Sequence, residues 1–100
     1  MKFLGCSAEL LHVHMFRILP VIDYITSELC GRTAIIMSTT EGFDIPDEGL
    51  AVDLRISDLS ADVQKRYFFA LDYALRRLCD VVFKDDYIHV AYNPSLKIIF

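Results

Sequence analysis

The chain has 100 residues, of which 54% are hydrophobic and 24% are charged, and its formal net charge is −4. This length fits a single domain, and this composition can fill a hydrophobic core, which excludes an intrinsically disordered chain. The acidic balance, together with the lack of any run of Lys and Arg in the sequence, argues against binding to a nucleic acid polymer. We therefore expect one compact domain over residues 1–100.

The cysteines Cys6, Cys30 and Cys79 are odd in number, widely spaced and without a Cys-x-x-Cys pair. This pattern argues against a disulfide framework or a zinc knuckle, so we interpret each cysteine as a small buried hydrophobic residue in a reducing compartment. Charged residues and histidines interrupt the N-terminal hydrophobic stretch, and only five residues precede Cys6. We therefore expect no signal peptide and no membrane span, and a soluble protein in the cytoplasm of the producing or infected cell.

The first third of the chain predicts a helix. Ser7 is suited to cap it, and apolar residues recur every three or four positions from Leu11 to Leu29. Pro20 lies inside this pattern, so it either kinks one helix or begins a second one. Gly31 is well placed to end the helical run in a left-handed conformation.

Two strands and a loop follow in the middle of the chain. Residues 33–38 are apolar and β-branched and predict a buried strand, whereas residues 41–49 contain two glycines, a proline and four acids and predict a loop. Residues 49–55 predict the next strand, with Leu50, Val52 and Leu54 on one face and Ala51, Asp53 and Arg55 on the other. The charges in this strand fit either a salt-bridged edge strand or a functional site.

A second helix is predicted after the turn and cap residues 57–60. Asp62 and Arg66, and Asp72 and Arg76, are spaced as exposed ion pairs on its polar side. Its apolar stripe consists of Val63, Tyr67, Phe68, Leu71, Leu75 and Leu78.

The C-terminal part of the chain predicts short strands. Residues 81–83 form one, residues 84–86 turn, and residues 87–92 alternate, which places Tyr87, His89 and Ala91 on one face. Residues 96–100 could form a last strand. The element order predicts an α+β fold, with a small mixed or antiparallel sheet and helices packed on one of its faces.

Two of the predicted strands carry residue types that bind metal ions. Asp53 lies on the middle strand, His89 lies on the later one, and Asp86 precedes His89 by three residues. A catalytic zinc ion takes three protein ligands and a water molecule, while a nearby carboxylate transfers protons. Asp53, His89 and Asp86 are therefore candidates for part of such a site.

Residues 49–55, a helix, and then residues 86–94 resemble the superfamily of D-Ala-D-Ala carboxypeptidases, phage endolysins and Hedgehog-like zinc peptidases. The pattern of that family is His-x-x-Gly-x-Ala-x-Asp, a helix, and an acid-x-x-His motif near the C-terminus. The element order agrees from the N-terminal helix onward, so the resemblance covers nearly the whole chain. It implies a Hedgehog/DD-peptidase-like fold in which Asp53 and His89 would bind zinc and Asp86 would be the general acid/base.

The sequence departs from the family pattern at three places. The first ligand histidine of the family falls on Pro46, which cannot bind a metal ion. The segment after the earlier strand, residues 38–42, lacks the arginine that holds the substrate carboxylate in the family. The acid that often follows the final histidine by two residues is Ala91 here.

Neighbouring residues could replace the missing ligand. Asp47 is adjacent to Pro46 in the sequence, and Asp44 and Glu48 share its loop. His12 and His14 could reach in from the predicted N-terminal helix. The two histidines are two residues apart and do not share a helix face, so at most one of them could reach the site.

The missing ligand favours a derivative that has lost catalysis and uses a remnant cleft to bind a small ligand, a peptide or a protein partner. Arg55, Tyr87 and Asp47 would line this cleft together with the zinc-type residues. Because compact family members resemble proteins of phages and small viruses, such a chain would be a phage or viral accessory or anti-defence protein. One alternative is an active zinc-dependent D,D-peptidase that cleaves peptidoglycan stem peptides; another is a structural module that forms a homodimer through an exposed strand such as residues 96–100.

Overall fold

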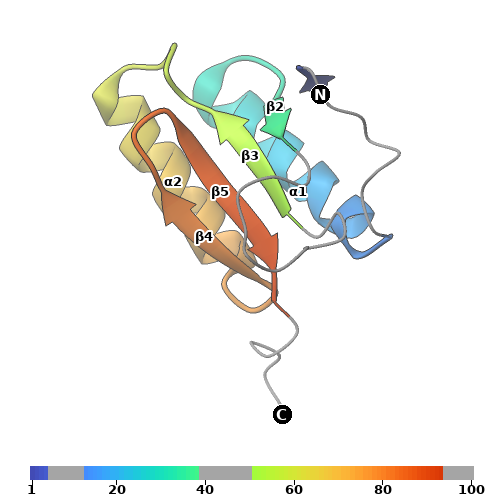
Figure 1. Cartoon of the computed structure of the whole chain (residues 1–100). Coiled ribbons are helices and arrows are strands. Elements are labelled where there is room, and N and C mark those ends of the chain that lie inside the picture. Colours follow the sequence, from blue (N-terminus) through green and yellow to red (C-terminus); the bar gives the residue numbers. More distant parts are fainter. Residues whose placement is uncertain (5–12, 39–50, 94–100) are drawn as a thin grey trace.

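The computed structural model describes residues 1–4, 13–38 and 51–93. Within these residues the elements are β1 (Lys2–Phe3), α1 (Val13–Cys30), β2 (Ile35–Ser38), β3 (Ala51–Arg55), α2 (Ala61–Leu75), β4 (Cys79–Phe83) and β5 (Tyr87–Tyr92). The strands form one sheet in the order β1-β2-β3-β5-β4 (Figure 1). β1 and β2 are parallel and all other neighbours are antiparallel, which confirms the predicted α+β class with a mixed sheet.

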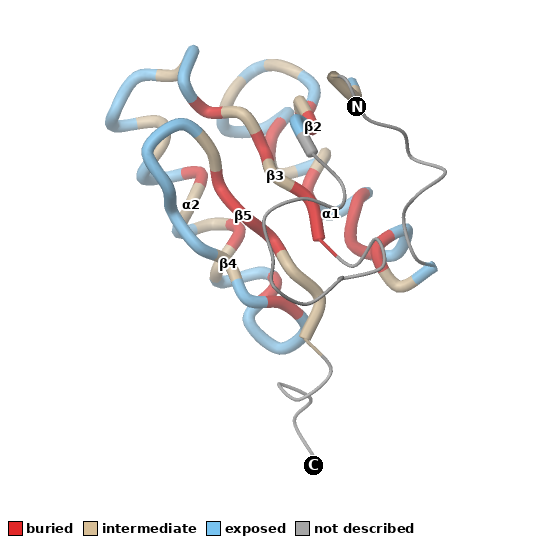
Figure 2. The backbone as a smooth tube through the Cα atoms, in the orientation of Figure 1, coloured by how far each residue is buried: buried red, intermediate tan, exposed pale blue. Residues whose placement is uncertain are grey.

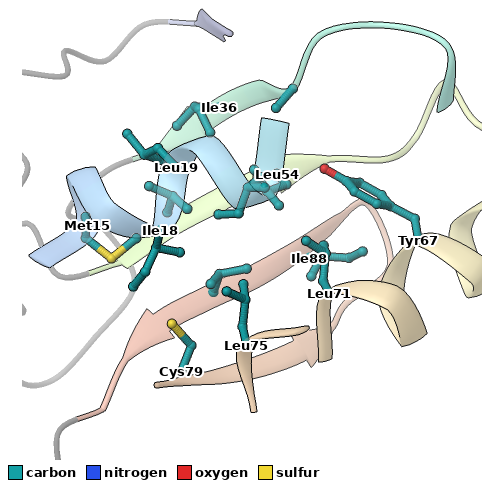
Figure 3. Packing of buried hydrophobic residues seen from close by; sticks show 14 of the residues in the cluster. Met15, Ile18, Leu19, Ile36, Leu54, Tyr67, Leu71, Leu75, Cys79 and Ile88 are labelled. Atoms are coloured by element: carbon teal, nitrogen blue, oxygen red, sulfur yellow. The ribbon is translucent and has the colours of Figure 1, made fainter. Parts of the chain in front are cut away.

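Both helices pack on the same face of the sheet (Figure 1), as predicted. The buried pairs Val52–Val90 and Leu54–Ile88 place one face of β3 and β5 against the helices. Figure 3 shows how side chains from both helices meet these strands in one hydrophobic cluster. The buried helical members of the cluster are Met15, Ile18, Leu19, Ile22, Tyr67, Leu71 and Leu75.

The first helix continues through Pro20 as a single 18-residue element. Of the two predicted alternatives, the second helix beginning at Pro20 is therefore wrong. The prediction for Gly31 is confirmed, because this residue has a φ of +66° and its N–H donates a hydrogen bond to the Ser27 carbonyl at 3.2 Å. The predicted cap, Ser7, lies outside the described residues.

The second helix begins as predicted. Ser60 has an extended backbone, and its hydroxyl accepts a hydrogen bond from the Val63 N–H at 3.3 Å. The exposed ion pair between Asp62 and Arg66 is present.

The end of this helix differs from the prediction. It stops at Leu75, so Leu78 lies beyond it and is exposed instead of extending the apolar stripe. The Arg76 guanidinium lies 5.0 Å from the centroid of the Tyr73 ring, where an ion pair with Asp72 was expected. A guanidinium stacked on an aromatic face competes with a solvent-exposed ion pair of similar small energy.

The sequence did not reveal β1. This strand has two residues, too few for any periodicity, and it is held by hydrogen bonds from the Lys2 and Leu4 N–H groups to the carbonyls of Ala34 and Ile36. The last strand predicted, residues 96–100, lies outside the described residues. None of the helices described is long and apolar enough to cross a membrane.

A buried hydrogen bond joins the two helices in the core. The Thr26 hydroxyl donates its single proton to the Ile22 carbonyl at 2.7 Å, so the Tyr67 hydroxyl must donate to Thr26 Oγ1. Burial raises the pKa of Tyr67 to about 12. The same cause raises the pKa of the Cys79 thiol to about 12.

We expect the folded chain to lose stability as the pH rises from about 10 to about 12. The Tyr67 phenol keeps its proton in the folded state over this range, whereas an unfolded tyrosine with a pKa near 10 loses it, so alkali favours unfolding. Urea denaturation at a series of pH values should show a loss of roughly 2–3 kcal/mol from Tyr67 that disappears in Tyr67→Phe, while the part that comes from the Cys79 thiol, whose pKa is also raised, remains. The exposed control Tyr73→Phe should keep the full dependence, and a Tyr67→Phe variant with an unchanged slope would contradict the assignment.

Candidate functional site

The face of the sheet opposite the helices carries a polar centre on two adjacent inner strands. Here β3 and β5 present three cross-strand pairs, which are Ala51–Ala91, Asp53–His89 and Arg55–Tyr87. We call these six residues the Asp–His face. Along the strands, the first pair consists of small side chains, the second of an acid and an imidazole, and the third of two large side chains.

The packing of the other face fixes this arrangement. Side chains alternate along a strand, so the register that buries Val52 against Val90 and Leu54 against Ile88 also brings Asp53 opposite His89. A slip of one residue would turn the aspartate into the hydrophobic core, which would cost far more than it could gain. The charged pair is therefore placed by the hydrophobic pattern around it. Figure 2 shows the buried stretches of β3 and β5 side by side.

Asp53 and His89 form a hydrogen bond of 2.6 Å between Oδ1 and Nδ1. The His89 side chain is 7% exposed and that of Asp53 is 16% exposed. A carboxylate oxygen only accepts, so Nδ1 carries the proton and donates it, which fixes the orientation of the ring. In a neutral imidazole of this tautomer, Nε2 is a hydrogen-bond acceptor. The two residues point toward each other across the sheet as predicted, and their role as zinc ligands stays a prediction.

Arg55 and Tyr87 lie next to this pair on the same face, about 7 Å farther along the strands. Both are half-buried. The Arg55 Nε–H donates to the Ser57 hydroxyl at 3.3 Å, which orients the guanidinium at the end of β3. These two residues, predicted to line a ligand site, are therefore brought beside the Asp–His pair.

Arg32 supports the same end of β3, and no sequence pattern singles it out. Its Nη2 donates to the Arg55 carbonyl at 3.2 Å and to Asp58 Oδ1 at 2.9 Å. The guanidinium thereby joins the end of α1 to the turn after β3. No motif marks this residue in the sequence, because its partners come from segments 23 and 26 residues away.

Ser38 is a second position that the sequence did not point to. Its backbone pairs with Asp53 on the side away from His89, at a shift of register between Ile36 and Ser38. Bulges of this kind bend a strand and occur often beside functional sites. A single extra residue leaves no trace in an apolar sequence pattern, so only the structure reveals it.

Asp86 is not brought to the pair. It is exposed in the turn between β4 and β5, about 10 Å along the strand from His89. Its carbonyl accepts a hydrogen bond from the Ile56 N–H at 3.1 Å, which holds the turn against the chain after β3. Its predicted role as general acid/base therefore depends on a movement of this turn. Asp47 lies outside the described residues.

The described residues do not complete a catalytic zinc site. Since Nδ1 of His89 donates to Asp53, the ring nitrogen that could bind a metal ion in this arrangement is Nε2. No group of three metal-binding side chains occurs within residues 1–4, 13–38 and 51–93. His14 stacks on the Tyr92 ring with centroids 4.7 Å apart, which holds it away from Asp53 and His89. His12 lies outside the described residues.

We expect the Asp53–His89 pair to contribute little net stability. Asp53→Val or His89→Val alone leaves a buried polar partner behind, and each should lower the free energy of unfolding by about 1–3 kcal/mol. The double variant places two valines opposite each other and should recover most of this loss, because an apolar pair avoids the desolvation cost. Urea denaturation at neutral pH measures all three, and a double variant that loses the sum of both single losses would contradict this.

Comparison of the chain with models of known protein families, with curated proteins and with solved structures gave no match.

Proposed function

We propose that the chain is a non-catalytic binding protein that holds a small ligand or a peptide on its Asp–His face. The observation that carries the proposal is the Asp53–His89 hydrogen bond, a polar pair enclosed in the middle of a sheet. Enclosing such a pair costs desolvation energy that an apolar pair would not. A role in binding accounts for its presence at a position that core packing alone would fill with valine or isoleucine.

The neighbouring residues indicate the chemistry of the ligand. The Arg55 guanidinium can bind a carboxylate or phosphate through its terminal NH2 groups, while its Nε is held by Ser57. Tyr87 adds a hydroxyl and an aromatic face on the adjacent strand. These features favour a ligand with an anionic group and a hydrogen-bonding or planar group about 7 Å from it.

We propose a protein without catalytic activity because of the residues that make up the site. Asp53 serves as the acceptor for Nδ1 of His89, and the one acid that the resemblance assigns to proton transfer, Asp86, lies in the exposed turn. Asp53 thereby orients the imidazole on the face that also carries Arg55 and Tyr87.

We expect an anionic ligand to raise the melting temperature of the protein, and Arg55→Ala to abolish most of this rise. A suitable panel contains short peptides with a free carboxylate, including D-Ala-D-Ala, and nucleoside monophosphates. A ligand at 100 times its Kd stabilises the folded state by about 2.7 kcal/mol, which a thermal shift assay detects.

The matched control is Arg66→Ala on the exposed side of α2, which should keep the full shift. The double variant Asp53→Val/His89→Val should lose the shift while remaining folded. A shift that persists in Arg55→Ala and in the double variant would place binding elsewhere. A panel without any shift would contradict the proposed ligand chemistry.

The second candidate is a zinc-dependent D,D-peptidase, and one observation favours it. Asp53 and His89, the two residues that the resemblance assigns to zinc, are adjacent in space. The third ligand would have to come from the part of the chain outside the described residues, with Asp47 as the named candidate. In this tautomer His89 would bind the ion through Nε2, because Nδ1 carries the proton that it donates to Asp53.

We expect protein purified without chelators or a metal-binding tag to contain no stoichiometric zinc. Elemental analysis of the wild type, Asp53→Ala and His89→Ala measures this directly. Stoichiometric zinc that disappears in both variants would overturn the metal-free proposal. A wild type that stays free of zinc after zinc has been supplied would exclude the peptidase.

A further inference from the structure

The strand β4 lies at one end of the sheet, and no described strand pairs with its outer side. Its inner side is paired with β5, where the Lys84 N–H donates to the Tyr87 carbonyl at 2.9 Å and the Asn93 N–H to the Leu78 carbonyl at 2.8 Å. Residues with even numbers therefore direct their main-chain groups toward β5. By the same alternation, the N–H and C=O groups of Val81 and Phe83 point outward.

The exposed centre of this edge is apolar. Val82 is 39% exposed and Phe83 is 36% exposed. The Phe83 ring lies 5.4 Å from that of Phe68, whose own neighbour at 5.4 Å is Phe69, a residue of α2 that is 65% exposed. The edge of the sheet and the adjacent side of α2 thus form an apolar surface, which proteins usually cover or protect with charges.

We propose that this edge is the interface of a homodimer, in which β4 of two copies pairs antiparallel about a two-fold axis at Val82. In this register Val81 lies opposite the partner's Phe83 and Phe83 opposite the partner's Val81. Both are residues whose main-chain groups point outward, so the pairing forms four hydrogen bonds without any change in the monomer. Val82 meets the partner's Val82 at a non-hydrogen-bonded position, where side chains approach most closely.

The charges at the ends of the strand fit the same register. Asp80 lies opposite the partner's Lys84, and Lys84 opposite the partner's Asp80, so two opposite-charge pairs flank the apolar centre. Asp80 already accepts a hydrogen bond from Asn93 through Oδ2 at 2.9 Å, which leaves Oδ1 to face the partner's lysine. Farther out, the exposed Arg76 of one copy lies at the same end as the partner's Asp86.

The alternative two-fold register, centred on Val81, fits less well. It would use the main-chain groups of Cys79, which is buried, and it would place Asp80 opposite the partner's Val82. In the Val82 register both the hydrogen bonds and the charges of the edge are complementary to those of an identical edge. We therefore infer that a second copy of the chain binds to the β4 edge. The interface is small, so the dimer should be weak and depend on protein concentration.

Sedimentation of the full chain over a range of concentrations tests the proposal. The wild type should approach twice the 11.5 kDa mass of the chain as its concentration rises. Asp80→Lys and Lys84→Asp should each raise the dimer dissociation constant by about tenfold or more, because each variant sets like charges opposite one another twice. The double variant Asp80→Lys/Lys84→Asp should restore dimerisation, since the swapped charges pair again across the two-fold axis.

Charge rescue separates this interface from simple loss of fold. Within one chain the two residues are about 13 Å apart along the strand, so a rescue reports contact between copies. Val82→Lys should give a monomer, whereas Val13→Lys, at an exposed apolar position of α1, should leave the dimer intact. A wild type that stays monomeric at hundreds of micromolar, a dimer insensitive to Val82→Lys, or a double variant without rescue would each overturn the proposal.

Discussion

The antiparallel pairing of β3 with β5 is the constraint on which the rest of the molecule depends. Two apolar pairs, Val52–Val90 and Leu54–Ile88, set its register from the side of the helices. Once that register is set, the alternation of side chains leaves no freedom on the opposite face, and Asp53 must meet His89. Hydrophobic packing thus fixes the position of the polar site, although it does not fix which residues occupy that position. The geometry of the proposed dimer interface depends on the same pairing. β5 pairs with β4 and thereby sets the register of β4 and the side of it that no described strand covers.

Much of this could be predicted from the sequence, and the reason is periodicity. Alternation in residues 87–92 and the three-to-four spacing in α2 each report on which side faces the core, and the class of fold followed from them. The cap at Ser60 followed from its residue type. Structural features that have no periodic pattern in the sequence could not be predicted. The two-residue β1, the bulge beside Ser38 and the partners of Arg32 depend on contacts between distant segments that leave no local pattern. The predicted apolar stripe extends past the end of α2, because Leu78 continues the apolar spacing after the helix has stopped at Leu75.

The site shows what a resemblance in residue spacing can predict and what it cannot. It correctly placed an aspartate and a histidine from different strands beside each other, which composition alone could not do. It also assigned an acid three residues before the histidine to proton transfer, and the structure puts Asp86 in an exposed turn. Spacing along the chain fixes which residues share an element, whereas the chemistry of a site depends on which groups converge in three dimensions. The hydrogen bond between the two side chains is the observation on which the proposed binding role rests.

The place of β5 between β3 and β4 has a consequence for synthesis on the ribosome. β3 and its aspartate are complete by residue 55, yet their partner strand ends only at residue 92. At 5–20 residues per second, the side of β3 that will bind β5 waits for roughly two to seven seconds, since both strands pass through the same exit tunnel. During that interval the nascent chain carries an apolar, unprotected strand edge, which is the kind of surface that invites wrong pairing. β5, the last of the described strands to emerge, thus completes the described core and brings Asp53 and His89 together in a single step.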